Sequence, residues 1–99
     1  MSISGLDVGT TGCKITVYDD LGNYLFRIYR NYPISRLTSG HEVDAKSIWS
    51  AVQEVIAEAA ARVSDLKGIG ITTFGETFVL LDETDSLLMP AMLYTDPRG

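Results

Sequence analysis

The chain has 99 residues, of which 45% are hydrophobic and 21% charged, a composition typical of one globular domain rather than two. Its formal net charge of −5 comes from acidic residues scattered along the chain, and its 8 Lys and Arg residues form no cluster. Sequence-independent nucleic-acid binding needs such a cluster, so the charge pattern excludes that class of function.

The single cysteine and the N-terminal sequence both predict a cytoplasmic protein. Cys13 has no second cysteine with which to form a disulfide, which favours a reducing compartment. The first residues, MSISGLDVG, lack the basic and apolar regions of a signal peptide. Because no window approaches the roughly 20 apolar residues that cross a bilayer, we expect no membrane partner.

Three strands are predicted in the first third of the chain. Residues 2–8 and 13–19 are rich in apolar residues with the alternation of strands, and the glycine-rich turn at 9–12 joins them. In the second strand Cys13, Ile15 and Val17 share one face. The turn sequence DLGN leads into a third strand at 24–32, so an antiparallel meander is expected.

The second half of the chain predicts a helix followed by further strands. After a loop at 34–43, Asp44 is placed to cap a helix whose apolar positions recur at steps of three and four residues. We expect these positions to form one buried stripe: Ile48, Trp49, Val52, Val55, Ile56, Ala59 and Val63. A buried strand at 67–73 follows, and the helical connection predicts that it runs parallel to a strand of the meander. A last pair of strands, 77–81 and 88–94, flanks the polar turn DETDS.

The turn at 9–12 has the composition of a phosphate-binding loop without the topology of a Walker loop. A Walker loop leads from a strand into a helix, whereas this turn leads into a second strand. Its backbone N–H groups and the hydroxyls of Thr10 and Thr11 would surround phosphate oxygens as a backbone nest does. Asp7 at the strand end would hold a hydrated Mg²⁺, and Lys14 would offset phosphate charge. A tight hairpin with no ligand is the structural alternative.

Four motifs resemble, in order, motifs of the FGGY family of carbohydrate kinases. DVGTTGCK at 7–14 is similar to the first phosphate motif of the superfamily that contains sugar kinases, actin and heat-shock chaperones. Three further stretches are similar to later motifs of the FGGY branch, which includes glycerol kinase and xylulokinase. They are GHEVDAKSIW at 40–49, IGITTFGETFVLLD at 69–82 and PAMLYTDPR at 90–98. The resemblance implies an α/β, ribonuclease H-like (actin-like ATPase) fold with the order strand-strand-strand-helix-strand.

The resemblance also implies roles for individual residues. The first motif would bind the ATP phosphates through Asp7, Gly9, Thr10, Thr11, Gly12 and Lys14, with Asp7 holding Mg²⁺ through water. The last two motifs would contact the substrate through Gly75, Glu76, Tyr94, Asp96 and Arg98. Gly75 departs from the spelling of both glycerol kinases and xylulokinases, so the resemblance names no particular sugar or polyol. A surface position for Glu76 and an ion pair between Asp96 and Arg98 are the structural alternatives.

The function that the resemblance implies is ATP-dependent phosphorylation of a sugar or polyol by a longer protein. The general base and the adenosine-binding motif of the family lie beyond these residues, so we assign no catalytic residue here. Residues 1–99 would form the N-terminal part of the first FGGY kinase domain, and the isolated fragment is expected to be inactive because phosphoryl transfer needs both lobes of a cleft. A non-catalytic or assembling member of the same ATPase superfamily is the alternative. An unpaired sheet edge in such a fragment would also favour a homodimer.

Overall fold

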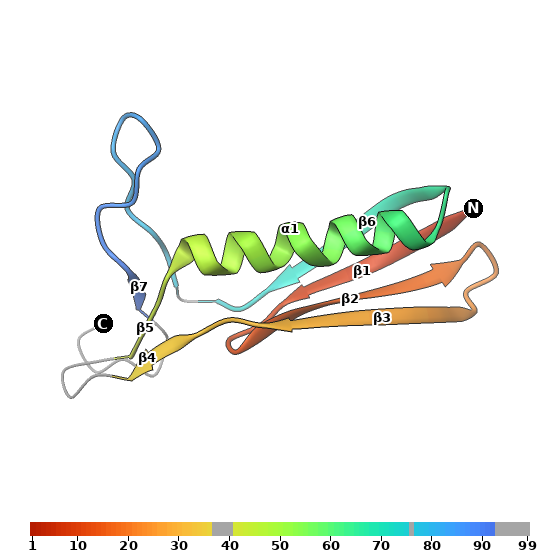
Figure 1. The fold of residues 1–99 in the computed structure, drawn as a ribbon, viewed down its shortest axis with the longest axis horizontal. Helices are drawn as coiled ribbons and strands as arrows, with labels where there is room; N and C mark the ends of the chain where they lie inside the picture. The colour runs from red at the N-terminus through yellow and green to blue at the C-terminus, as the bar shows by residue number, and fades with distance from the viewer. Residues whose placement is uncertain (37–40, 76, 93–99) are drawn as a thin grey trace.

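The structure is a computed structural model, and it describes residues 1–36, 41–75 and 77–92. A mixed sheet carries one helix on one face, and a smaller sheet lies beyond one end of it (Figure 1). The larger sheet has the order β3-β2-β1-β6 and contains β1 (Ser2–Val8), β2 (Gly12–Asp19), β3 (Tyr24–Asn31) and β6 (Leu66–Thr73). The smaller sheet has the order β4-β5-β7 and contains β4 (Ile34–Arg36), β5 (His41–Val43) and β7 (Ala91–Met92). The helix, α1, spans Ala45–Arg62.

The predicted meander and the predicted parallel strand are both confirmed. β1 pairs with β2 and β2 with β3 in antiparallel fashion, and the first pairing places Asp7 opposite Lys14. β6 runs parallel to β1, with Thr73 beside Val8. The carboxyl ends of β1 and β6 therefore lie at the same end of the sheet (Figure 1).

The turn between β2 and β3 forms around one carboxylate. Asp19 Oδ1 accepts hydrogen bonds from the backbone N–H groups of Leu21 and Asn23 at 2.9 and 2.8 Å. Gly22 adopts a φ of +86°, which a residue with a side chain rarely adopts. The Asn23 side-chain amide donates to the other carboxylate oxygen. Together with the backbone donors, this hydrogen bond holds the pKa of Asp19 below its usual value.

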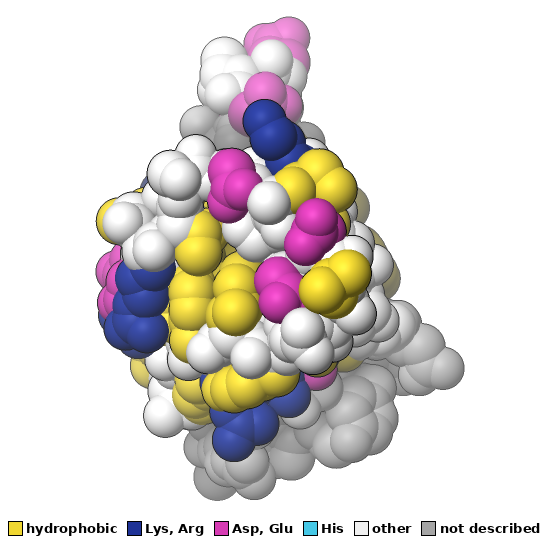
Figure 2. Space-filling view, turned by 90° about the vertical axis from the view of Figure 1, so that its right-hand side faces the viewer, with side chains coloured by type: hydrophobic (Ala, Val, Ile, Leu, Met, Phe, Trp, Pro, Cys, Tyr) yellow, Lys and Arg dark blue, Asp and Glu magenta, His cyan; other side chains and the backbone are white. Residues whose placement is uncertain are grey.

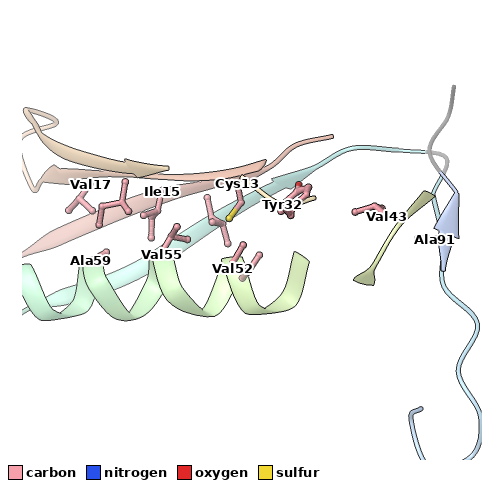
Figure 3. Close-up of a cluster of buried hydrophobic side chains, with 12 residues drawn as sticks. Cys13, Ile15, Val17, Tyr32, Val43, Val52, Val55, Ala59 and Ala91 are labelled. Atoms are coloured by element: carbon pink, nitrogen blue, oxygen red, sulfur yellow. The ribbon is translucent and has the colours of Figure 1, made fainter. Parts of the chain in front are cut away.

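The helix begins at the predicted cap and buries the predicted face of β2. Asp44 Oδ1 accepts a hydrogen bond from the Lys46 backbone N–H at 3.0 Å, which satisfies one of the free donors of the first turn. Ala51, Val52, Val55 and Ala59 are the buried residues of α1. They face the fully buried side chains Cys13, Ile15 and Val17 of β2, as Figure 3 shows.

Charged side chains fix α1 over β3 as well. Arg30 on β3 donates from Nη2 to Glu58 Oε1 at 2.7 Å, and its Nε lies 3.6 Å from Glu54 Oε2. Arg62, in the last turn of the helix, pairs with Glu58 at 2.9 Å and places its guanidinium carbon 5.1 Å from the centre of the Phe26 ring. These contacts hold the helix over the β2 and β3 side of the sheet.

Two predictions of burial are wrong, one for a helix residue and one for a strand. Both depend on which part of the sheet the helix covers. Trp49 is 61% exposed, because it lies one residue, about 100°, round the helix from Ile48 on the packed side. The strand β6 was expected to be buried, yet Ile71 is 69% exposed. β6 lies at the edge of the sheet opposite to β3, and α1 packs over β2 and β3 instead.

The predicted loop at 34–43 contains two short strands. Ile34 pairs with Val43 between β4 and β5, and Val43 pairs with Ala91 between β5 and β7. Val43 and Ala91 are buried, so this small sheet has its own apolar contact (Figure 3). A strand of three residues is too short to show periodicity. The pairing of β5 with β7 also joins residues that are almost fifty positions apart in the chain.

The predicted strand pair around DETDS is also corrected. The turn itself is present, because Asp82 Oδ1 accepts hydrogen bonds from the N–H groups of Thr84 and Ser86 at 2.8 and 2.9 Å. Its flanks are joined by an isolated bridge between Leu81 and Leu87 rather than by a ladder. Residues 91–92 pair with β5 instead, and residues 93–94 lie outside the described residues.

The molecule is extended rather than spherical. Its Cα radius of gyration is 15.5 Å, against about 13 Å for a compact domain of 100 residues, and the segment around DETDS projects away from the sheets (Figure 1). Figure 2 shows the end of the molecule that contains the N terminus and the β2–β3 turn. Acidic, basic and hydrophobic side chains are interspersed on this surface. None of the described residues forms a helix long and apolar enough to cross a membrane.

Candidate functional site

The predicted phosphate turn and the start of the predicted substrate loop lie side by side. The turn at 9–12 follows β1, and the loop that begins at Phe74 follows β6. The Phe74 backbone N–H donates to the Val8 carbonyl at 3.0 Å, which extends the contact between the two strands up to the turn. Gly75 comes next in the chain and is exposed, with no atom within 4 Å of a Cβ built on it. In sheets of this kind, ligands bind where the carboxyl ends of neighbouring strands meet.

The structure does not test the other predicted substrate residues. Glu76, Tyr94, Asp96 and Arg98 lie outside the described residues. Gly75 is therefore the one predicted substrate residue whose position beside the turn is described.

Asp7 and Lys14 project from the sheet face that is opposite to α1. Alternation along the strands sends Leu6 and Cys13 toward the helix, so their neighbours Asp7 and Lys14 point the other way. A groove of about 500 Å³ lies on this face, and both side chains line it together with Thr16 and residues 70–72 of β6. Asp7 is exposed and Lys14 half-buried, which leaves a carboxylate and an ammonium accessible next to the turn.

The turn is closed by its own backbone and by close packing. The Gly9 N–H donates to the Gly12 carbonyl at 2.9 Å. A Cβ at position 12 would lie 2.5 Å from both the Arg30 carbonyl oxygen and the Tyr29 hydroxyl, so only glycine fits without a shift. Thr11 is exposed, and its hydroxyl lies 3.4 Å from the Tyr29 hydroxyl. This turn therefore presents short polar groups on a tightly held backbone.

Tyr32 is the residue of this site that the sequence did not reveal. The residue is 5% exposed, and the single proton of its hydroxyl is shared between the carbonyl oxygens of Gly9 and Gly12, the latter at 3.1 Å. Its backbone N–H donates to the Thr11 carbonyl at 3.1 Å. Burial raises the pKa of Tyr32 to about 12, so its hydroxyl stays protonated and remains a donor at neutral pH. Aromatic residues at the end of a strand are common, so no local signal distinguishes this one.

The donor set around the turn suits a cation that binds through water and phosphate. Among the described residues no three His, Cys, Asp or Glu side chains gather to hold a metal ion. Mg²⁺ differs from Zn²⁺ in this respect, since it is held by one or two carboxylates, several waters and phosphate oxygens. The exposed carboxylate of Asp7 beside the turn fits that pattern.

Cys13 takes no part in the groove. It is fully buried against α1, and burial raises the pKa of its thiol above the usual value. The prediction that Cys13 shares one face of the strand with Ile15 and Val17 is confirmed, since all three are fully buried.

An antiparallel meander with a glycine-rich turn, followed by a helix and a parallel strand, is the arrangement of the actin-like ATPase fold. Residues 2–99 match the family model described as "FGGY family of carbohydrate kinases, N-terminal domain". The chain therefore belongs to the FGGY family of carbohydrate kinases.

Two curated relatives illustrate the similarity. The chain is 34% identical over 100 residues to a glycerol kinase of Acinetobacter baylyi, with 95% of this chain and 20% of that protein covered. It is 32% identical over 98 residues to a xylulose kinase of Arthrobacter sp., with 98% of this chain and 96% of that protein covered.

Two solved structures share the fold over almost the whole chain. A ligand-bound xylulose kinase from Lactobacillus acidophilus matches with a TM-score of 0.90 at 29% identity, covering 96% of this chain and 20% of that one. A Plasmodium falciparum glycerol kinase with ADP matches with a TM-score of 0.89 at 25% identity, covering 98% of this chain and 21% of that one. The chain thus spans about a fifth of the length of the Acinetobacter relative and of both solved structures.

Proposed function

We propose that the chain is the N-terminal part of the first domain of a kinase that transfers the γ-phosphate of ATP to a hydroxyl of a sugar or polyol. The observation that carries this proposal is the contact between the phosphate turn after β1 and the loop after β6, which Phe74 and Val8 join. Phosphoryl transfer needs ATP and the acceptor hydroxyl to be held next to each other, and this end of the sheet has one surface for each. Membership of the carbohydrate kinase family supports the class of acceptor.

The turn residues would hold the nucleotide. The backbone N–H groups of the turn and the hydroxyls of Thr10 and Thr11 are donors, which suit phosphate oxygens. Lys14 lines the groove and would offset phosphate charge. Asp7 would hold a hydrated Mg²⁺, which neutralises charge on the phosphate oxygens when it is bound. The ADP in the Plasmodium falciparum structure supports a nucleotide at this fold.

The substrate side would be built around the loop after β6. Gly75 leaves open space there, which a side chain at this position would restrict. Glu76 would accept hydrogen bonds from substrate hydroxyls, for which an ionised carboxylate is well suited. We propose that Tyr94, Asp96 and Arg98 complete this wall, as the resemblance of their motif implies.

The remaining parts of the proposal concern the whole protein. We place the general base outside residues 1–99, so the isolated chain would have no kinase activity. The scattered charge and the single buried cysteine support a cytoplasmic location. Among the described residues β6 pairs with β1 alone, and such an open edge favours association of the isolated chain into a homodimer.

The test is ADP release by the full-length protein with Mg·ATP across a panel of polyols, ketopentoses, ketohexoses and aldonates. We expect one of these chemical classes to stimulate ADP release, and the isolated residues 1–99 to release none with the same compounds. If the folded full-length protein binds ATP and no compound stimulates release, the assembling alternative replaces the proposal. ADP release by the isolated chain above background would contradict the placement of the general base.

A further inference from the structure

Tyr32 contacts three different residues of the phosphate turn through two donors, its hydroxyl and its backbone N–H. Its hydroxyl reaches the carbonyls of Gly9 and Gly12, and its backbone N–H reaches the carbonyl of Thr11. The ring is held in place because it is buried in the hydrophobic cluster that includes Cys13 (Figure 3). The side chain therefore links the turn to the core of the domain.

The direction of this contact determines where the turn presents its donors. Tyr32 approaches from the same side as Cys13, which is the side that α1 covers, whereas Asp7 and Lys14 line the groove on the opposite face. In a trans peptide the carbonyl of one residue and the N–H of the next point in opposite directions. When the Gly9 carbonyl points to the Tyr32 hydroxyl, the Thr10 N–H must point away from the core.

We propose that Tyr32 is a positioning residue for ATP: its hydroxyl anchors the Gly9 and Gly12 carbonyls from the core side, so that the Thr10 N–H is fixed toward the phosphates. This inference rests on the proposed function, because it assumes that the turn binds the ATP phosphates. A turn with two glycines has many accessible backbone conformations. A turn that is already anchored binds phosphate without losing further conformational entropy. Because burial keeps the hydroxyl protonated, the anchor persists across the physiological pH range.

The test compares nucleotide affinities of the full-length wild type, Tyr32→Phe and Tyr24→Phe by calorimetry with ATP, ADP and AMP. Tyr24→Phe removes the same hydroxyl from an exposed tyrosine at the other end of β3, so it is the matched control. We expect Tyr32→Phe to weaken ATP binding about tenfold, because the variant loses one hydrogen bond. AMP binding and the KM for the carbohydrate should stay within about twofold of wild type. AMP lacks the β- and γ-phosphates that the turn is proposed to hold.

The outcomes separate this inference from the proposed function. Wild-type ATP affinity in Tyr32→Phe overturns the positioning role, and so does an equal loss of ATP and AMP affinity, which indicates general damage to the fold. A wild type that binds ATP and phosphorylates no carbohydrate overturns the proposed acceptor, while the ATP affinity of Tyr32→Phe still decides the positioning role. A folded wild type that binds no nucleotide overturns both.

A fluorinated tyrosine at position 32 keeps the inference testable if Tyr32→Phe does not fold. Fluorine lowers the pKa of the phenol and retains the ring and the oxygen, so the donor is present at low pH and lost at higher pH. We expect ATP affinity to fall, relative to wild type, as the pH rises through the lowered pKa. An affinity that follows wild type at every pH overturns the inference.

Discussion

At the scale of single residues, side chains of opposite charge occupy paired positions where the first two strands approach the turn. Asp7 and Lys14 are cross-strand neighbours that line the same groove. Mg·ATP carries both signs of charge, and its cation is attracted to a carboxylate while its phosphates are attracted to an ammonium. On the proposed function, the two side chains would have separate roles, which can be measured separately.

The carboxylate of Asp7 is expected to set the magnesium requirement of the kinase activity proposed for the full-length protein. We predict that Asp7→Asn raises the Mg²⁺ concentration for half-maximal activity about 10- to 100-fold, because a neutral amide does not balance the charge of a hydrated cation. A Mg²⁺ titration at constant ATP measures this shift. Asp20→Asn is the control, since it removes an exposed acid at the turn between β2 and β3, the opposite end of the sheet (Figure 1). An unchanged requirement in Asp7→Asn would contradict the role assigned to it.

The close packing of Gly12 makes a separate prediction about stability. A Cβ there would lie 2.5 Å from a backbone carbonyl oxygen, so Gly12→Ala must shift the turn or β3. We expect the free energy of unfolding of the full-length protein to fall by about 1–3 kcal/mol, as for other overpacked sites, measured by urea denaturation. Gly68→Ala is the matched control, because no atom lies within 4 Å of its added Cβ. Equal stability of the two variants would show that the turn tolerates a side chain.

At the scale of elements, the main sheet and the helix follow from local patterns. Alternation places Cys13, Ile15 and Val17 on one face of β2, and all three are buried under α1. The turn between β2 and β3 and the start of α1 follow from the hydrogen-bonding chemistry of Asp19 and Asp44, which acts over two to four residues. Such features are predictable because the residues that determine them are adjacent in the chain.

The cap of α1 provides a prediction at this scale. We expect Asp44→Ala to lower the free energy of unfolding by about 1 kcal/mol, because the Lys46 N–H loses its side-chain acceptor. Asp44→Ser keeps an acceptor oxygen at the cap and should retain most of the stability. Urea denaturation of both variants in the full-length protein measures the difference. A serine variant as unstable as the alanine variant would show that the cap is not the cause.

Features that depend on distant partners were not predictable from the sequence. The pairing of Val43 with Ala91 and the hydrogen bonds from Tyr32 to the turn join residues far apart in the chain, so no local pattern indicates them. The exposure of Trp49 depends on where the sheet lies under the helix, which periodicity alone does not give. For the candidate site, the sequence indicated the turn and its charged neighbours as candidates, whereas it did not indicate the hydrogen bonds of Tyr32 to the turn.

At the scale of the whole molecule, the part of the chain that follows the helix exposes a series of apolar side chains. Large hydrophobic residues of β6 and of the following segment are exposed: Ile69, Ile71, Phe78, Val79, Leu80, Leu81 and Leu88. Within the part of the chain that the structure describes, β6 pairs on one side only, with β1. An apolar edge strand of this kind pairs readily with another chain.

We therefore predict that the isolated residues 1–99 self-associate in a concentration-dependent way. Light scattering over a dilution series measures the mass. Ile71→Lys is expected to reduce association, because a charge on an edge strand opposes pairing. Gln53→Lys adds the same charge to the exposed face of α1 and should leave association unchanged. An isolated chain that is monomeric at every concentration would contradict the prediction.

The most direct test of the proposed function follows the γ-phosphate itself. The full-length protein is incubated with ATP labelled at the γ-phosphate, Mg²⁺ and the acceptor panel, and the labelled products are separated. The proposal predicts label in a phosphorylated sugar or polyol, and less of that label in Asp7→Asn at the same Mg²⁺ concentration. Label found in inorganic phosphate alone would show that ATP is hydrolysed without an acceptor, which would contradict a carbohydrate kinase and favour an assembling ATPase.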